Sequence, residues 1–172
     1  MNRKFLIADT HFGDENIINF ENRPFENADE MDEALIENWI NTVDEQDTIY
    51  VLGDVFSKND VEYITSILER VNGNIIIIKG NHDNEDTLNF IKSFERVTVY
   101  EYPIVIDNFW ILSHEPMYVN TNSPYANIFG HVHADPKYVT YSSRSACVSV
   151  ERTNYTPILL EEVKRKVLEC NK

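Results

Sequence analysis

The stretch that decides the fold is residues 74–83, which read NIIIIKGNHD. Its isoleucine run is apolar at every position and does not alternate with polar residues. Strands that are buried on both faces of a parallel sheet have this pattern. Two earlier runs are of the same kind, because residues 4–8 end at Asp9 and residues 48–52 end at Gly53-Asp54. We therefore predict three buried, parallel strands in the first half of the chain.

Helical patterns lie between these runs. Residues 28–43 carry apolar side chains at helical spacing, with Asp and Glu on the opposite face. Residues 61–71 repeat the pattern, and Ser57 is the expected N-cap. Strands that alternate with helices predict right-handed crossovers and a layered α/β fold.

The pattern changes after about residue 95. Asp107-Asn108 is expected to form a hairpin turn between two strands. We expect this half to be richer in antiparallel strands and to form a second sheet packed on the first. The expected strands are residues 97–100, 104–106, 109–112, 126–129, 138–141, 147–150 and 157–160, and residues 161–169 are expected to form a charged terminal helix. No repeat or linker-like stretch divides the chain, so residues 1–172 are predicted to be a single domain.

The composition is that of a globular protein, with 42% hydrophobic and 26% charged residues in 172. Asp and Glu number 29 against 15 Lys and Arg, which gives a formal net charge of −14. Such a surface repels anionic lipids and phosphate backbones, so we expect no membrane partner and no long nucleic acid. No signal peptide or spanning segment is visible and nothing suggests a disulfide between Cys147 and Cys170, so a cytoplasmic protein without an obligate protein partner is expected.

Polar side chains follow the predicted strands at the point where each strand ends. In an open α/β sheet, ligands bind beyond the carboxyl ends of the strands, so we expect these side chains to converge. Imidazole and carboxylate are natural ligands of divalent transition metals. Gly53, Gly80 and Gly130 each precede one of them and would allow close backbone approach. The set consists of Asp9, His11, Asp54, Asn81, His82, His114, His131 and His133.

Each of these residues alone also has an ordinary structural explanation. A lone histidine after a strand is more often a surface residue than a ligand, and Asp9 or Asp54 alone could be a helix N-cap. Asn81 could be a turn residue. The complete set, placed after successive strands, favours a metal site.

The sequence resembles the calcineurin-like metallophosphoesterase superfamily over residues 9 to 133, and residues 8–25 resemble its small bacterial and phage members. Five motifs carry the resemblance in the family's order. They are Asp9-Thr10-His11, Gly53-Asp54, Gly80-Asn81-His82-Asp83, His114 and Gly130-His131-Val132-His133.

The resemblance implies a four-layer α/β/β/α sandwich, with two mixed sheets flanked by helices and two metal ions at one edge. It assigns the first ion to Asp9, His11, Asp54 and His133, and the second to Asp54, Asn81, His114 and His131. It also implies that His82 faces the leaving group or a phosphate oxygen, where Asp83 can hydrogen-bond it. The resemblance favours Mn²⁺, while Fe, Zn²⁺ and Ni²⁺ also suit the ligand types.

The expected function is therefore hydrolysis of small phosphate esters by in-line attack of a hydroxide that bridges two ions. His82 would protonate the leaving oxygen and Asp83 would orient it, unless Asp83 is instead the N-cap of a following helix. Asn81 and His82 would also contact the substrate, and Arg23 has two readings, a phosphate contact or a surface salt bridge. Phosphodiesters are preferred, because no extra cluster of basic groups is present for a dianionic monoester.

Two other functions stay open. A nuclease of the superfamily's DNA-repair branch would need a DNA-binding region, which this short acidic chain lacks unless a partner supplies it. A non-catalytic scaffold with the same fold is disfavoured because no ligand of the motif set is missing. Residues 12–25 and 118–125 are the loops expected to control substrate choice, the second as a lid.

Overall fold

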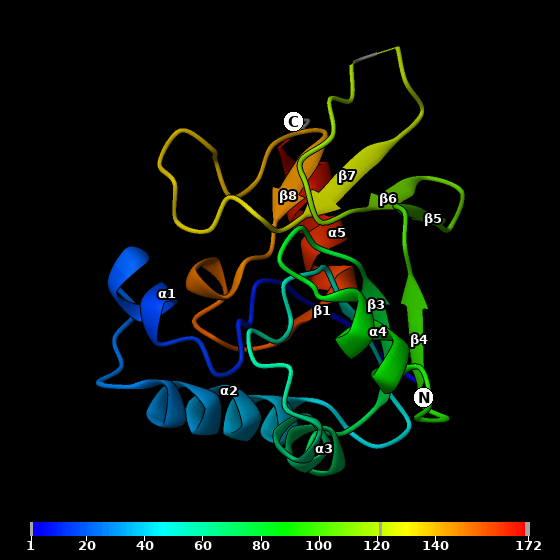
Figure 1. Ribbon diagram of the computed structural model, residues 1–172. Helices are drawn as coiled ribbons and strands as arrows, with labels where there is room; N and C mark the ends of the chain where they lie inside the picture. The colour runs from blue at the N-terminus through cyan, green and yellow to red at the C-terminus, as the bar shows by residue number, and fades with distance from the viewer. Residues whose placement is uncertain (1, 121, 171–172) are drawn as a thin grey trace.

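The computed structural model describes residues 2–120 and 122–170. Its larger sheet has five strands, with β9 antiparallel to β1 and the other neighbours parallel. All three runs predicted from the first half of the sequence are parallel strands of this sheet (Figure 1). In spatial order the strands are β4 (Val97–Tyr100), β3 (Asn74–Ile78), β2 (Thr48–Val51), β1 (Lys4–Ile7) and β9 (Ile158–Leu159).

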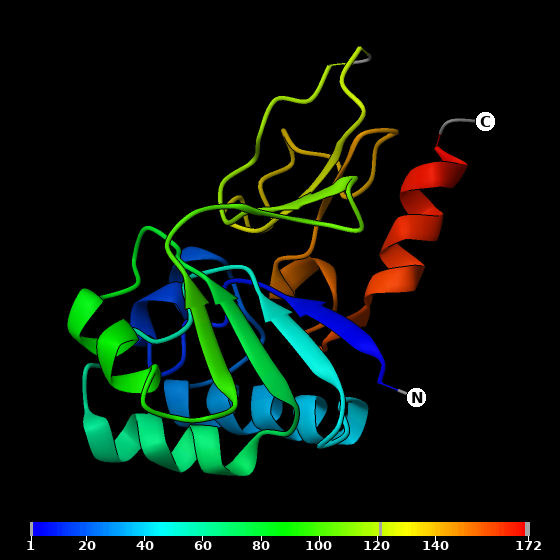
Figure 2. The ribbon, with the colours of Figure 1, turned by 90° about the vertical axis from the view of Figure 1, so that its right-hand side faces the viewer.

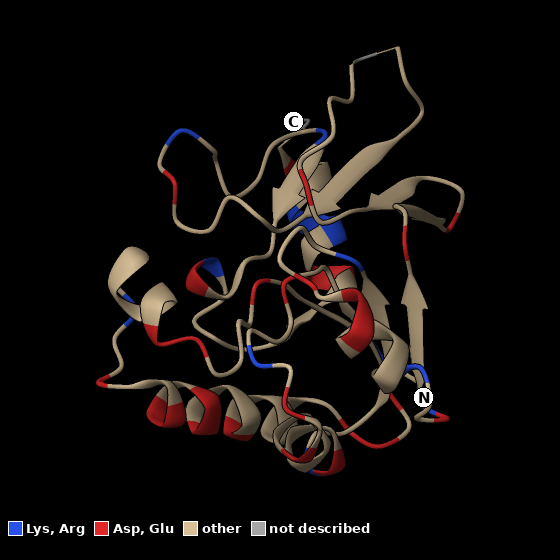
Figure 3. Ribbon diagram, in the orientation of Figure 1, with Lys and Arg blue, Asp and Glu red and all other residues tan. Residues whose placement is uncertain are grey.

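Helices cover one face of this sheet. Helices α2 (Ala28–Thr42) and α3 (Val61–Arg70) lie side by side beneath the strands in Figure 2, and their apolar stripes form a core with the sheet. Two shorter helices, α1 (Glu15–Phe20) and α4 (Glu85–Ile91), follow β1 and β3. Asp and Glu are spread over the outer helices, as Figure 3 shows.

The expected N-cap of α3 is wrong. The side chain of Asp60 accepts a hydrogen bond from the amide of Tyr63 at 2.7 Å, which makes Asp60 the N-cap. Ser57 is too far from the helix start, and its hydroxyl instead donates to Asp14 at 3.1 Å. Helix α1 was not predicted, because six residues are too few to display a helical period.

The second sheet contains β5 (Ile104–Ile106), β6 (Trp110–Leu112), β7 (Ala126–Phe129) and β8 (Ser145–Cys147), in that order. The turn at Asp107-Asn108 is confirmed, since β5 and β6 pair antiparallel and both turn residues have positive φ. The second half is richer in antiparallel pairs than the first, as expected, because β5 pairs antiparallel with β6 and β9 pairs antiparallel with β1. Strands β6, β7 and β8 are nevertheless parallel to one another. Parallel neighbours need long connections, and the segments 113–125 and 130–144 provide them.

Two expected strands of the second half differ from the structure. Residues 138–141 form only an isolated bridge, between Tyr141 and Ala146, with a hydrogen bond of 2.9 Å from the Cys147 amide to the Thr140 carbonyl. The Tyr138 carbonyl is bonded instead by the side chain of Arg152, at 2.9 Å. The strand expected at 147–150 is shifted to β8, and Val150–Arg152 form a 3-10 turn.

A second core lies between the two sheets. It contains the upper face of the first sheet, the inner face of the second, and the buried side of α5 (Leu160–Glu169). The protein is therefore a mixed α/β fold of two mixed sheets flanked by helices, as expected. Within residues 2–120 and 122–170, no helix has the length and apolar character needed to cross a bilayer. Cys147 is buried, Cys170 is exposed, and both are free thiols.

Backbone hydrogen bonds tie the strand ends together where the two sheets meet. The amide of Asp9 after β1 donates to the carbonyl of Gly53 after β2, at 3.1 Å. The amide of Gly130 after β7 donates to the carbonyl of His114 after β6, at 2.9 Å. The amide of His131 after β7 donates to the carboxylate of Asp9 after β1 at 2.9 Å, which joins the loops of the two sheets at one edge of the molecule.

Candidate metal centre

The strand-end loops assemble two adjacent groups of metal-type side chains. Within each group the ligand atoms lie within 4.8 Å of one another. One group contains Asp9, His11 and His133, and the other contains Asp54, His114 and His131. The remaining predicted ligand, Asn81, places its Oδ1 2.8 Å from Nε2 of His114. The structure thus brings all seven predicted ligands to one place.

Asp54 faces both groups. Its Oδ2 lies 3.3 Å from Nε2 of His114 in one group and 3.7 Å from Nε2 of His11 in the other. Its Oδ1 accepts a hydrogen bond of 2.8 Å from the amide of His82, which fixes the orientation of the carboxylate. One oxygen of Asp54 is therefore placed between the two groups, where a bridging ligand would be.

The donor atoms fit a divalent cation. Nε2 of His11 is buried and has no hydrogen-bond partner, an arrangement that is rare and costly in folded proteins. Burial lowers the pKa of His11 to about 4, so its imidazole is neutral and keeps a free lone pair. A cation bound between His11 and Asp54 would supply the missing partner.

The pKa values of the buried acidic and imidazole groups also favour a bound cation. Burial raises the pKa of Asp9 to about 6, because its carboxyl group is fully removed from water. Burial opposes a charge on His114, but the hydrogen bond and charge of Asp54 prevail and raise the pKa of His114 to about 9. His114 therefore carries a proton at neutral pH, and its positive charge offsets the negative charge of the buried carboxylates beside it.

The backbone of the candidate ligands is strained. A left-handed conformation of a residue other than glycine costs on the order of 1–3 kcal/mol and is found mainly at functional sites. Such positions are of interest because the surrounding fold must compensate their cost. Among the candidate ligands, φ is 60° at Asp9, 51° at His11, 54° at Asp54, 68° at His131 and 45° at His133.

Two glycines are required by the close packing of the carboxylates. A Cβ atom on Gly80 would lie 2.2 Å from Oδ1 of Asp54, and one on Gly130 would lie 2.7 Å from Oδ2 of Asp9. Both distances are far below van der Waals contact. The close backbone approach expected at these glycines is confirmed.

Hydrogen bonds to backbone and side-chain oxygens orient the histidines. Nδ1 of His114 lies 2.8 Å from the carbonyl oxygen of Leu52, so Nδ1–H donates there and Nε2 is directed to Asp54. Nδ1 of His133 lies 3.0 Å from Oε1 of Glu151. Contacts of this kind fix the tautomer and raise the basicity of a metal-binding histidine.

Glu151 is a site residue that sequence reasoning missed. Its side chain is only 5% exposed, and it contacts both His133 and Arg23. Burial opposes its charge, but the hydrogen bond to His133 keeps the pKa of Glu151 below its usual value. The ligand atoms of Glu21, His133 and Glu151 also lie within 4.8 Å of one another. The hydrogen bond between His133 and Glu151 already explains why these two side chains are close, so we do not count this group as a separate metal site.

Arg23 forms a salt bridge, as one of its two readings expected, but the bridge is buried and not at the surface. Its side chain is fully buried, so it is neither a substrate contact nor a surface salt bridge. The guanidinium donates to the carbonyl oxygens of Asp9 at 2.7 Å and Thr10 at 3.0 Å, and it pairs with Glu151 at 2.7 Å. Arg23 therefore holds the loop after β1 against the turn that carries Glu151.

His82 and Asp83 are placed differently from each other. The His82 ring centroid lies 5.7 Å from that of His11, and His82 lines a hollow of about 480 Å³ with Asp14 and Glu15. The carboxylate of Asp83 is turned into the protein and accepts backbone hydrogen bonds from Asp54, Val55 and Gly80 at 2.7–3.0 Å.

The two readings of Asp83 therefore need correction. Both of its oxygens are occupied by amides, and none of the hydrogen bonds found among the described residues joins it to His82. It is not the N-cap of α4 either, because Asn84 accepts the bonds from Asp86 and Thr87. Asp83 holds the loops of Asp54 and Gly80 together.

The loop expected to act as a lid is only partly described. Residue 121 of the segment 118–125 lies outside the described residues. Tyr118 is 93% exposed, so its side chain does not cover the metal centre. A lid role for this segment stays a prediction.

Replacing Glu151 by Gln is expected to weaken Mn²⁺ binding about 10- to 100-fold, because the neutral amide supports the His133 imidazole less well than a carboxylate. Isothermal titration calorimetry measures this affinity, and thermal unfolding checks that the variant is folded. Glu161→Gln, an exposed position on α5, removes the same charge without touching the site. Equal affinity of Glu151→Gln and the wild type would show that Glu151 does not support the metal centre.

Comparison with known proteins adds a family and two relatives. A family model described as calcineurin-like phosphoesterase matches residues 3–138. An uncharacterized protein of Methanocaldococcus jannaschii is 36% identical over 172 residues, which cover 97% of this chain and 92% of that protein. The crystal structure of a protein of unknown function from Aquifex aeolicus is similar, with a TM-score of 0.72, 25% identity, and coverage of 96% of this chain and 99% of that one.

Proposed function

Because the chain belongs to the calcineurin-like phosphoesterase family, we propose that it hydrolyses phosphodiesters at a centre of two divalent metal ions. The observation that carries this proposal is the oxygen of Asp54 between two groups of donor atoms. We assign the first ion to Asp9, His11, Asp54 and His133, and the second to Asp54, Asn81, His114 and His131. Mn²⁺ is the ion that we propose, since it accepts carboxylate, amide and imidazole ligands together.

Two bound ions would supply a water-derived nucleophile at neutral pH and offset the charge of the phosphoryl oxygens. The protein provides the remaining requirement, a proton for the leaving oxygen. His82 stands at the rim of the centre, beside His11 and open to the hollow that it lines. We assign it the role of the acid that donates this proton.

The preference for diesters is supported by the charges around the centre. At neutral pH a diester carries one negative charge and a monoester carries close to two. The hollow beside His82 is lined by Asp14 and Glu15, and Arg23 is buried in an ion pair. A substrate with the smaller negative charge is repelled less by these carboxylates.

The substrate preference predicts an order of rates. With Mn²⁺, kcat/KM for bis(p-nitrophenyl) phosphate should exceed that for p-nitrophenyl phosphate at least about tenfold, equivalent to about 1.4 kcal/mol. Release of p-nitrophenolate measures both rates. Asp54→Asn protein, purified in the same way, controls for contaminating phosphatases. The reverse order of rates would contradict the diester preference and leave a monoesterase.

A further inference from the structure

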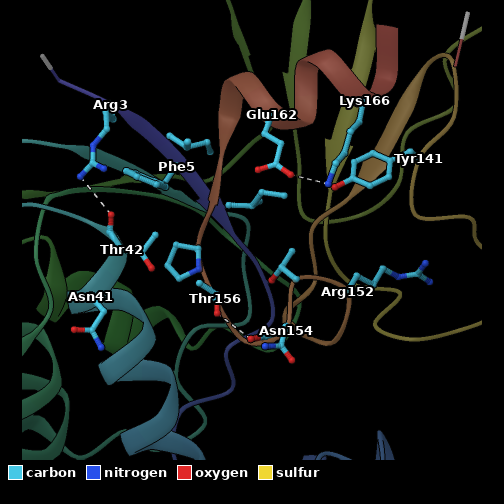
Figure 4. A pocket seen from close by; sticks show the side chains of 14 residues that line it. Arg3, Phe5, Asn41, Thr42, Tyr141, Arg152, Asn154, Thr156, Glu162 and Lys166 are labelled. Atoms are coloured by element: carbon cyan, nitrogen blue, oxygen red, sulfur yellow. Dashed lines mark hydrogen bonds and ion pairs between the residues drawn. The ribbon is translucent and has the colours of Figure 1, made fainter. Parts of the chain in front are cut away.

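One large hollow of the protein lies away from the metal centre. It measures about 660 Å³ and is shown in Figure 4, with Arg3, Arg152 and Lys166 along its wall. These cations are all engaged, because Arg3 pairs with Asp47, Lys166 pairs with Glu162, and Arg152 donates to the His133 carbonyl. Among the described residues that line this hollow, the named cations are thus all engaged, so we assign no anion site to it.

A second hollow, of about 540 Å³, opens directly beside the metal centre. Asn81 and His114, two of the proposed ligands of the second ion, form part of its wall. We call it the Tyr102 pocket, defined by the carbon-rich side chains of Ile78, Tyr102, Pro103, Pro116 and Met117. A group bound in this pocket would adjoin a phosphate at the second ion.

Two large side chains of the pocket are open to solvent. Tyr102 is 79% exposed and Met117 is 43% exposed, although both are large and apolar. Aromatic rings and methionine thioethers stack well against flat rings. By contrast, the hollow on the His82 side is lined by glycine and by polar and acidic residues such as Asp14 and Glu15. The two hollows beside the centre therefore differ in chemistry.

The charges of the Tyr102 pocket disfavour a second anionic group. Three carboxylates, from Glu85, Glu101 and Glu115, lie along its wall together with one ammonium group, from Lys79. Nζ of Lys79 lies 3.4 Å from Glu85 and 3.6 Å from Glu101, so its charge is already matched. These charges favour a neutral ring over an anionic group, and the carboxylates could accept hydrogen bonds from amino groups on such a ring.

We propose that the Tyr102 pocket binds the ester group that stays on phosphorus, and that this group carries an uncharged aromatic ring such as a nucleobase. The proposal rests on the proposed phosphodiester hydrolysis. In that reaction the oxygen of water forms a new bond to phosphorus, and the bond to the leaving oxygen breaks. The leaving oxygen takes a proton on the His82 side, and the product is the monoester of the ring-bearing group.

Two substrates with the same leaving group test the proposal. Phenyl p-nitrophenyl phosphate and methyl p-nitrophenyl phosphate differ only in the group that stays on phosphorus. The ratio of their kcat/KM values should fall about 5- to 10-fold in Tyr102→Ala, since an aromatic contact contributes on the order of 1 kcal/mol. Tyr118→Ala is the matched control, because Tyr118 is 93% exposed and does not line the pocket.

The outcomes separate this proposal from the proposed function. Hydrolysis of the methyl ester, with an unchanged ratio in Tyr102→Ala and Met117→Ala, overturns the pocket and leaves the diesterase intact. If neither ester is hydrolysed, the pocket is tested by binding alone. The Mn²⁺-loaded protein is then titrated calorimetrically with phenylphosphonate and with methylphosphonate. Tighter binding of phenylphosphonate that Tyr102→Ala abolishes supports the pocket, and any other binding result overturns it.

Discussion

Asp54→Asn is expected to abolish the binding of two Mn²⁺ ions and to lower the hydrolysis of bis(p-nitrophenyl) phosphate on the order of 10³-fold or more. Asp54 is placed to serve both donor groups, because its Oδ2 lies 3.3 Å from Nε2 of His114 and 3.7 Å from Nε2 of His11. Its loss should therefore affect both halves of the centre, whereas the loss of His131 should affect one.

The substitution keeps the shape of the side chain and changes its chemistry. Oδ1 of Asp54 accepts a hydrogen bond from the amide of His82, so the oxygen of the new Asn side chain should take that place. The NH₂ group is then directed at Nε2 of His11 and His114, where its protons occupy the position of a cation. One negative charge is lost as well, which lowers the attraction for any divalent ion.

Metal content after dialysis against Mn²⁺ measures the first effect, and p-nitrophenolate release measures the second. Mn²⁺ should raise the unfolding temperature of the wild type by mass action and raise that of Asp54→Asn much less. The control is Asp44→Asn, because Asp44 is 80% exposed and pairs with Arg3 away from the centre. Two ions bound with wild-type affinity by Asp54→Asn would rule out the bridging position.

The sequence predicts the central strands well, because a strand that is buried on both faces must be apolar throughout. The run at 74–78 is apolar at four of its five positions, and it forms β3 with the predicted bounds. Residues 138–141 have a similar apolar and aromatic character, yet they form no strand. The side chain of Arg152 bonds the Tyr138 carbonyl, and the Thr140 carbonyl accepts a bond from the Cys147 amide of β8. The contact with Arg152 comes from a residue 14 positions away, so the local sequence pattern of residues 138–141 could not predict it.

Strand direction in the second sheet could not be predicted for a related reason. Short apolar runs look the same whether the next strand is parallel or antiparallel, and only the path of the connection differs. The connection between β6 and β7 returns the chain to the end of the sheet at which β6 begins, so β6 and β7 run in the same direction.

In the site, too, the sequence predicts residues whose role depends on their type and position, but not those whose role depends on contacts made in the folded protein. The motif residues could be placed by chemistry and position, because side chains that follow parallel strands must share an edge. Arg23 and Asp83 stand in the same segments, but their partners are backbone groups that only the folded loops bring near. Glu151 carried a usable signal, since it directly follows the apolar run 146–150, as the candidate ligands follow theirs.

His82→Ala is expected to keep both metal ions and to lower kcat on the order of 10²–10⁴-fold, the usual contribution of a general acid. The loss should be largest for diesters whose leaving alcohol has a high pKa, because such an oxygen departs only with a proton. Metal binding should persist, because the contact of residue 82 with Asp54 is made by its backbone amide, which alanine retains.

A series of aryl diesters with leaving groups of increasing pKa separates the two functions that His82 could have. If His82 is the acid, the plot of log kcat against leaving-group pKa becomes steeper in His82→Ala while the metal content stays at the wild-type value. Asn89→Ala, an exposed change on α4, should alter neither quantity. If metal content falls together with rate, and the slope is unchanged, then His82 is a ligand, and the proton for the leaving oxygen has another source.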